Sequence, residues 1–182
     1  MMYWKGCNRS IEGMSEFSFQ INYDENSYTV MGYKGNSEEV IVPETFLGKP
    51  VTILFDKLFL EHPEIRSIKI PDTVTDLGEF VFDGCENLRH IDLPKSLRNI
   101  WGYTFARCGI EEIILPDRVR AIPPYAFKEC MELKKVICGA GMKKIYSWAF
   151  GGCPNLTELI HGPGVEISPE AFDMNTAILK VQ

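Results

Sequence analysis

Four cysteines recur at nearly equal spacing and could form disulfides or bind a metal. They are Cys85, Cys108, Cys130 and Cys153, and the sequence contains no Cys-x-x-Cys pair. If they share one position of a repeat, with His62 and Asn175 at the two ends, they form a file with about 5 Å between neighbours. Tetrahedral zinc needs four converging ligands, which a file cannot supply. Free cysteine is readily buried, so we interpret these thiols as structural, with chance disulfides or a metal as alternatives.

A second pair, Cys138 and His161, could act as a nucleophile and its base. Both stand where other repeats place an inward aliphatic residue, and they come from adjacent repeats. Catalysis would also need an orienting third group, an oxyanion donor and a cleft, for which the neighbouring sequence offers no candidates. We therefore interpret them as polar residues near the edge of a core, and keep a Cys/His hydrolase as a remote alternative.

The segment Gly139-Ala-Gly-Met-Lys-Lys144 combines glycines and lysines as a phosphate-binding loop does. The Gly-Lys-Ser/Thr ending of such a loop is missing, and Gly139 stands where sister repeats have proline. The segment is therefore predicted to be a repeat turn. From these three groups we predict no catalytic residue, no metal site and no cofactor.

An internal repeat must position all of these residues. Its units begin at Pro71, Pro94, Pro116, Gly139 and Gly162, which are 23, 22, 23 and 23 residues apart. In the first four units, aliphatic residues follow three and six places after the start, then aromatic residues at nine and eleven places, then the cysteine. Such a period is typical of stacked leucine-rich coils, which bury their apolar residues against each other. Four aromatic residues are therefore expected to line up inside the molecule: Phe82, Phe105, Phe127 and Phe150.

Each unit ends in a stretch of alternating apolar residues, such as 65–70, which predicts a short parallel strand with one buried face. Loops and short helical turns complete each coil. Residues 17–33 predict two strands joined by a turn at 23–26, which we interpret as a cap on the first coil. The predicted fold is a leucine-rich-repeat solenoid of the α/β horseshoe class. Residues 1–42 form the N-terminal segment with its capping hairpin, and 43–182 form about six coils of the same continuous domain.

The offsets Pro-x-x-Val-x-x-Ile-x-x-x-Ala-Phe-x-x-Cys-x-x-Leu-x-x-Ile, clearest in 116–136 and 139–159, resemble the BspA-type leucine-rich repeats. The stretches 28–35, 40–43 and 48–51 also resemble the way those proteins begin, so the resemblance covers roughly residues 17–182. It implies a bacterial protein, secreted or on the cell surface, that attaches to host components and carries no catalytic motif. The chain as given shows no signal peptide at its start.

Charge and hydropathy exclude two classes of partner. The 182 residues carry 25 acidic and 19 basic side chains, mixed along the chain, for a net charge of −6. This balance argues against nucleic-acid binding. No run of 18 or more apolar residues occurs, which argues against membrane insertion.

The outward side chains of the predicted strands form two columns. One alternates in charge and includes His90, Glu112, Lys135 and Glu158; the other includes Lys69, Asp92, Ile114, Ile137 and Ile160 and would end at Gln182. The charged column is interpreted as a stabilising ladder. The isoleucines are interpreted either as a contact site or as β-branched residues stacked along the sheet.

These columns lead to the predicted function. We predict a non-enzymatic binding or adhesion module that recognises a protein or glycan through the concave face of its sheet. The candidate partner-binding residues are Lys69, His90, Asp92, Glu112, Ile114, Lys135, Ile137, Glu158 and Ile160. A structural or self-assembling repeat protein, which associates weakly through its C-terminal edge, is the alternative.

Overall fold

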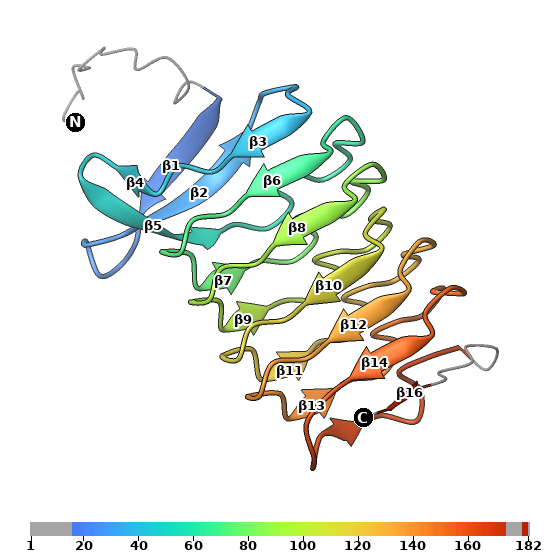
Figure 1. Ribbon diagram of the computed structural model, residues 1–182. Coiled ribbons are helices and arrows are strands. Elements are labelled where there is room, and N and C mark those ends of the chain that lie inside the picture. Colours follow the sequence, from blue (N-terminus) through green and yellow to red (C-terminus); the bar gives the residue numbers. More distant parts are fainter. Residues whose placement is uncertain (1–15, 174–179, 182) are drawn as a thin grey trace.

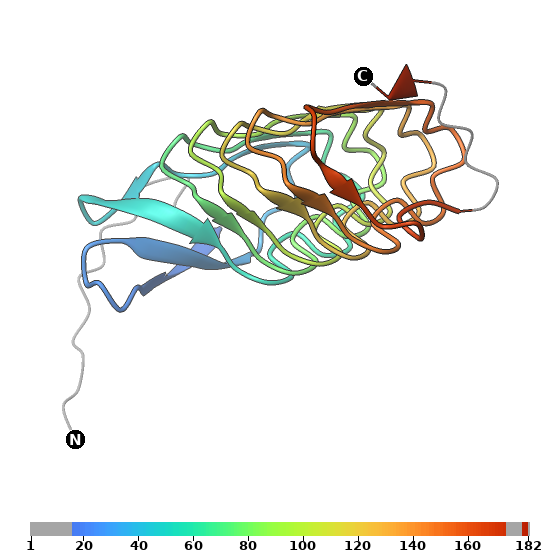
Figure 2. The ribbon, with the colours of Figure 1, turned by 90° about the horizontal axis from the view of Figure 1, so that it is seen from below.

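The computed structural model describes residues 16–173 and 180–181, and the latter only as backbone. Asn175 and Gln182, named above, and residues 1–15 of the N-terminal segment lie outside this range. The chain winds as a β-solenoid of about six turns, with the hairpin at one end and the coils stacked behind it (Figures 1 and 2).

Strands supply all the regular structure of the described residues. They are β1 (Phe17–Ile21), β2 (Tyr28–Tyr33), β3 (Glu39–Ile41), β4 (Thr45–Phe46), β5 (Lys49–Leu54), β6 (Ser67–Lys69), β7 (Asp76–Leu77), β8 (His90–Asp92), β9 (Asn99–Ile100), β10 (Glu112–Ile114), β11 (Ala121–Ile122), β12 (Lys135–Ile137), β13 (Lys144–Ile145), β14 (Glu158–Ile160), β15 (Glu166–Ile167) and β16 (Lys180–Val181).

Each coil contributes one strand to each of two rows (Figure 1). The long row, of three-residue strands, contains β3, β6, β8, β10, β12 and β14; the short row, of two-residue strands, contains β7, β9, β11, β13 and β15. Except between β8 and β10 and between β9 and β11, neighbours in each row pair in parallel and in register, so that Ile113 of β10 lies opposite Val136 of β12. In the long strands only the middle residue is fully buried. This is the alternation that the sequence predicted.

An unbroken file of phenylalanines runs through the core, which confirms the predicted alignment. Its members are Phe59, Phe82, Phe105, Phe127, Phe150 and Phe172. Successive ring centroids lie between 5.1 and 5.6 Å apart, and the rings are within 13° of parallel. Stacked aromatic pairs contribute about 0.5–1.5 kcal/mol each beyond their burial. The repeat thus stabilises each coil chiefly through its neighbours.

The hairpin cap is confirmed. Strand β1 pairs antiparallel with β2, and β2 pairs in parallel with β5, so the hairpin extends the first sheet. Asp24 shapes its turn, because its carboxylate accepts hydrogen bonds from the backbone N–H groups of Asn26 and Ser27. Phe17 packs edge-on against Phe59, with ring centroids 6.5 Å apart, and so covers the end of the phenylalanine file.

The short helical turns expected between strands are not helices in the described part of the chain. They are single turns with i→i+3 hydrogen bonds, such as that from Cys85 N–H to the Phe82 carbonyl at 3.0 Å. In five successive coils the turn after the short strand has two positions with positive φ, for example Tyr103 at 58° and Arg107 at 52°. A left-handed residue every few positions ends any run of helical φ, ψ values, so a helix cannot form.

The coil of residues 94–115 is joined to each neighbour by only one of the two strand rows. Its long strand β10 does not pair with β8, and its short strand β9 does not pair with β11. In the short row Pro123 has no N–H, whereas Trp101 N–H and Tyr146 N–H each donate to the preceding coil. Near the long row, the unit of residues 94–115 is one residue shorter than its neighbours. The backbones also lie close together there, since a Cβ on Gly109 would lie 2.1 Å from the Glu86 carbonyl oxygen.

Candidate functional site

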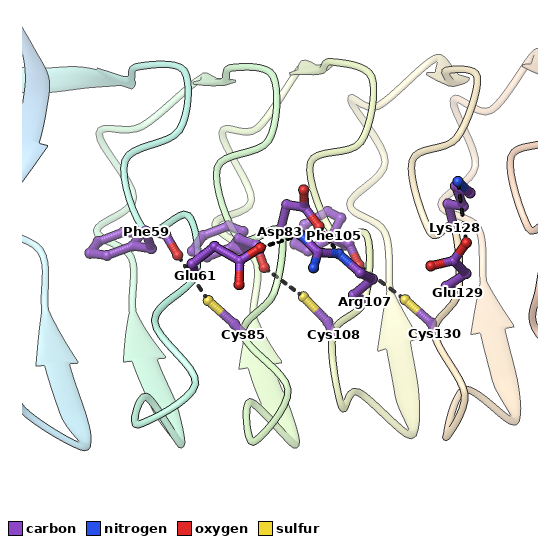
Figure 3. A network of polar contacts seen from close by, with 11 residues as sticks. Phe59, Glu61, Asp83, Cys85, Phe105, Arg107, Cys108, Lys128, Glu129 and Cys130 are labelled. Carbon is purple, nitrogen blue, oxygen red and sulfur yellow. Dashed lines mark hydrogen bonds and ion pairs between the residues drawn. The ribbon is translucent and has the colours of Figure 1, made fainter.

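The four repeat cysteines are structural. Each thiol donates to the carbonyl of a phenylalanine in the coil before it; Cys108 Sγ, for example, lies 3.0 Å from the Phe82 oxygen. The same bond joins Cys85 to Phe59, Cys130 to Phe105 and Cys153 to Phe127, and Figure 3 shows the first three thiols in line. Burial raises the pKa of the Cys85 thiol to about 12. All four are free and buried, and each serves as a hydrogen-bond donor to the preceding coil.

In the described residues, Cys138 and His161 are not arranged as a nucleophile and its hydrogen-bonded base. His161 Nδ1 lies 2.7 Å from the Gly162 carbonyl and must donate to it, and its Nε2 is buried with no partner in the described structure. No hydrogen bond joins the two side chains among the described residues. Burial raises the pKa of the Cys138 thiol to about 12. The thiolate that nucleophilic attack requires is therefore absent near neutral pH.

The glycine segment is a turn between coils, as predicted. A Cβ on Gly139 would lie 2.5 Å from Asp117 N, and one on Gly141 would lie 1.9 Å from the Asp117 carbonyl oxygen. The Asp117 carboxylate also accepts from Ala140 N–H at 2.8 Å. The glycines are therefore required by the close approach of the preceding coil.

The structure places the candidate binding residues on the outer face of the long row. Lys135 lies opposite Glu112 and Glu158 on the two adjacent strands. Lys135 Nζ is 3.6 Å from a Glu112 carboxylate oxygen, and His90 Nε2 is 3.1 Å from Asp92. These pairs are largely exposed, so each contributes little to stability, but they hold opposite charges in fixed rows.

The isoleucine column borders a hollow that the sequence did not predict. Ile114, Ile137 and Ile160 lie opposite one another on β10, β12 and β14, and the Ile114 side chain is 60% exposed. The hollow, of about 740 Å³, is lined by Ile114 and Ile137 and by residues of the turns that follow, including Lys95 and Arg118. These turn residues could have been found in the sequence, because they share a repeat position one or two residues after each unit start.

A second group that sequence reasoning missed is an ion-pair network beside the cysteine file (Figure 3). Arg107 Nε donates to the buried Asp83 carboxylate at 2.8 Å, and another guanidinium nitrogen donates to Glu61 at 2.6 Å. Between them in the stack stands Gly84, whose missing side chain leaves room for Arg107 to reach two coils back. The two carboxylates raise the pKa of Arg107. The network clamps three coils together.

Neither a metal centre nor a membrane span emerges from the described residues. No three or more His, Cys, Asp or Glu side chains gather there in a way that could hold an ion. No helix in this part of the chain is long and apolar enough to cross a bilayer.

Fold and repeat together define a leucine-rich-repeat β-solenoid with an exposed strand face. The chain belongs to the family of BspA-type leucine-rich repeat proteins, whose model matches residues 52–178 in six copies. Proteins of this family are often surface-associated. No curated protein matches the chain.

Several solved bacterial structures share the fold. The leucine-rich repeat protein TpLRR of T. pallidum is 26% identical, with a TM-score of 0.66, over 84% of this chain and 83% of that one. A leucine-rich repeat protein from Bacteroides ovatus is 23% identical (TM-score 0.67; 92% of this chain, 52% of that one). The pneumococcal vaccine antigen PcpA is 20% identical (TM-score 0.72; 90% and 41%). The chain thus spans about half of the second protein and less of the third.

Proposed function

We propose that the chain is a non-enzymatic recognition module, located at a bacterial cell surface, that binds a protein or glycan partner on the outer face of its long strand row. The observation that carries the proposal is the isoleucine column in register on β10, β12 and β14, in which Ile114 is exposed and Ile137 and Ile160 are partly buried. An apolar stripe beside a row of charged residues, on a face open to solvent, is typical of a contact surface.

Two further observations support the proposal. A solenoid offers a long, stiff surface without needing an enclosed pocket. The side chains with chemistry to offer are also occupied elsewhere, since the repeat thiols donate to backbone carbonyls and Cys138 is protonated. Family members and structural neighbours are generally non-enzymatic as well.

The experiment compares two variants that replace an isoleucine by glutamine at the same repeat position but in different coils. Ile137→Gln removes the centre of the isoleucine column, whereas Ile41→Gln changes an exposed isoleucine of the same repeat position on β3, at the other end of the row. Both keep the charge unchanged. Binding is measured by surface plasmon resonance against a panel of purified extracellular-matrix proteins and a glycan array.

For any partner bound by the unaltered chain, Ile137→Gln is expected to weaken binding by about tenfold or more, because truncating a central apolar contact typically costs more than 1 kcal/mol. Ile41→Gln should leave affinity within about twofold. If Ile137→Gln folds normally and binds every partner as the unaltered chain does, the outer face is not the binding surface.

A further inference from the structure

A basic hollow lies on the short-row side of the same coils and adjoins the hollow beside the isoleucine column, because Asp117 and Arg118 line both. It has a volume of about 550 Å³ and is lined by Arg98, Asn99, Asp117, Arg118, Arg120, Gly141 and Lys143. Four of these seven side chains are cationic, although the whole chain carries a net charge of −6. The positive charge is therefore concentrated and not an average property of the surface.

Three of the cations occupy one repeat position in successive coils. Arg98, Arg120 and Lys143 each stand four residues after a unit start, and Lys143 N–H donates to the Arg120 carbonyl at 2.8 Å. Neighbouring coils lie about 4.8 Å apart, and like charges placed opposite each other at that distance destabilise a sheet. The column on the other face avoids this cost, because Glu112 and Lys135 alternate in sign.

The four cations also lack counter-ions. None of them forms an ion pair within residues 16–173, whereas Arg66, Arg107, Lys128, Lys134, Lys135 and Lys144 all do. The single carboxylate in the hollow, that of Asp117, is engaged by the backbone N–H of Ala140. The hollow thus holds stacked positive charges that an external anion would relieve.

The shape of the hollow favours an extended ligand. Gly141 stands at the repeat position of Arg118, and the Asp117 carbonyl oxygen, 1.9 Å from where its Cβ would lie, leaves no room for a side chain there. Two exposed aromatic residues follow the same strands: Trp101, 55% exposed, comes directly after β9, and Tyr146, 40% exposed, directly after β13. Such amphipathic rings suit contacts with a ligand that is partly apolar and partly polar.

We propose that this basic hollow binds an anionic polysaccharide, with one sulfate or carboxylate group against each of Arg98, Arg120 and Lys143. Guanidinium groups bind such planar or tetrahedral anions through paired hydrogen bonds. Nucleic acid is disfavoured by the small number of cations, because affinity for a phosphate backbone depends on how many phosphates are neutralised. The site adjoins the hollow of the isoleucine column, but Arg98, Arg120 and Lys143 line only the basic hollow, so the proposal does not depend on binding at the isoleucines.

The test uses heparin and dextran sulfate as anionic polysaccharides, neutral dextran as the uncharged polymer, and a thymidine oligonucleotide as the competing polyanion. The variant Arg98→Gln/Arg120→Gln/Lys143→Gln removes the column. A matched control, Lys34→Gln/Arg66→Gln/Lys128→Gln, makes the same charge change at positions outside the hollow. Affinity is measured by calorimetry at two salt concentrations, and melting temperature by circular dichroism.

The unaltered chain is expected to bind heparin and dextran sulfate, more weakly at higher salt, and not neutral dextran. The column variant should lose at least about tenfold in affinity, which corresponds to about 1.4 kcal/mol, while the matched control stays within about twofold. The melting temperature of the column variant should stay the same or rise, because the substitutions remove a repulsion between like charges.

Two results would overturn the proposal: no binding of either sulfated polymer, or an equal loss of affinity in the matched control. Tighter binding of the oligonucleotide that also depends on the column would refute the polysaccharide assignment. Ile137→Gln is expected to bind heparin like the unaltered chain, so failure of the outer-face proposal can be told apart from failure of this one.

Discussion

Replacement of Phe105 by alanine is expected to split the solenoid into two separately unfolding parts. Phe105 is fully buried and stacks on Phe82 at 5.4 Å and on Phe127 at 5.1 Å. Loss of a buried phenylalanine side chain costs about 3–5 kcal/mol, a large share of the roughly 5–15 kcal/mol that stabilises a domain. Phe105 lies in the coil of residues 94–115, which pairs with each neighbouring coil through only one strand row.

The matched control is Phe150→Ala, which also removes two stacked contacts, at 5.4 and 5.3 Å. The coil of Phe150 pairs through both of its strands with both neighbours, so cooperativity should survive there. Urea denaturation is followed by circular dichroism and by hydrogen exchange with mass spectrometry. We expect two transitions for Phe105→Ala and one shifted transition for Phe150→Ala. A single shifted transition for both variants would refute the idea that the 94–115 coil is the weak junction.

Three further predictions test individual contacts. Gly109→Ala should destabilise by about 1–3 kcal/mol, since its Cβ would meet the preceding backbone, whereas Gly162→Ala, with no atom within 4 Å, should change the melting temperature little. Arg107→Met should cost about 1–2 kcal/mol in chemical denaturation, because it leaves the buried Asp83 carboxylate unpaired; an unchanged midpoint would show that the clamp is dispensable. Stability should fall as pH rises from about 9 toward 12, because the folded state holds the pKa of Cys85 at about 12 while unfolded thiols ionise near 9.0; a melting temperature that is flat over this window would contradict the burial of that thiol.

The fold was predictable because it follows from the spacing of the repeat. Equivalent residues at a fixed period must lie above one another, so the file of Phe82, Phe105, Phe127 and Phe150 and the parallel strands follow from counting. The absence of helix was not predictable in the same way. It depends on positive φ values at residues such as Tyr103 and Arg107, and side-chain type gives no sign of those values.

The surface was predictable only in part. The register of Glu112 with Lys135 and of Ile114 with Ile137 follows from the period. The basic hollow was missed although Arg98, Arg120 and Lys143 share one repeat position, because the only columns followed in the sequence were those of the strands that end each unit. The Arg107 network was missed for a related reason, since Arg107 reaches Glu61 across an intervening glycine, 46 residues away in the chain.

The central claim is that the side chains able to do chemistry are buried parts of the coil stack, so that function resides on the surface. Thiol labelling at neutral pH tests it most directly, in a Cys7→Ser background that leaves five cysteines. We predict that Cys85, Cys108, Cys130, Cys138 and Cys153 react with an alkylating reagent only as fast as the solenoid unfolds, because all five are buried and unionised thiols are poor nucleophiles. Rapid labelling of Cys138 in the folded protein would contradict the account and favour a catalytic thiol.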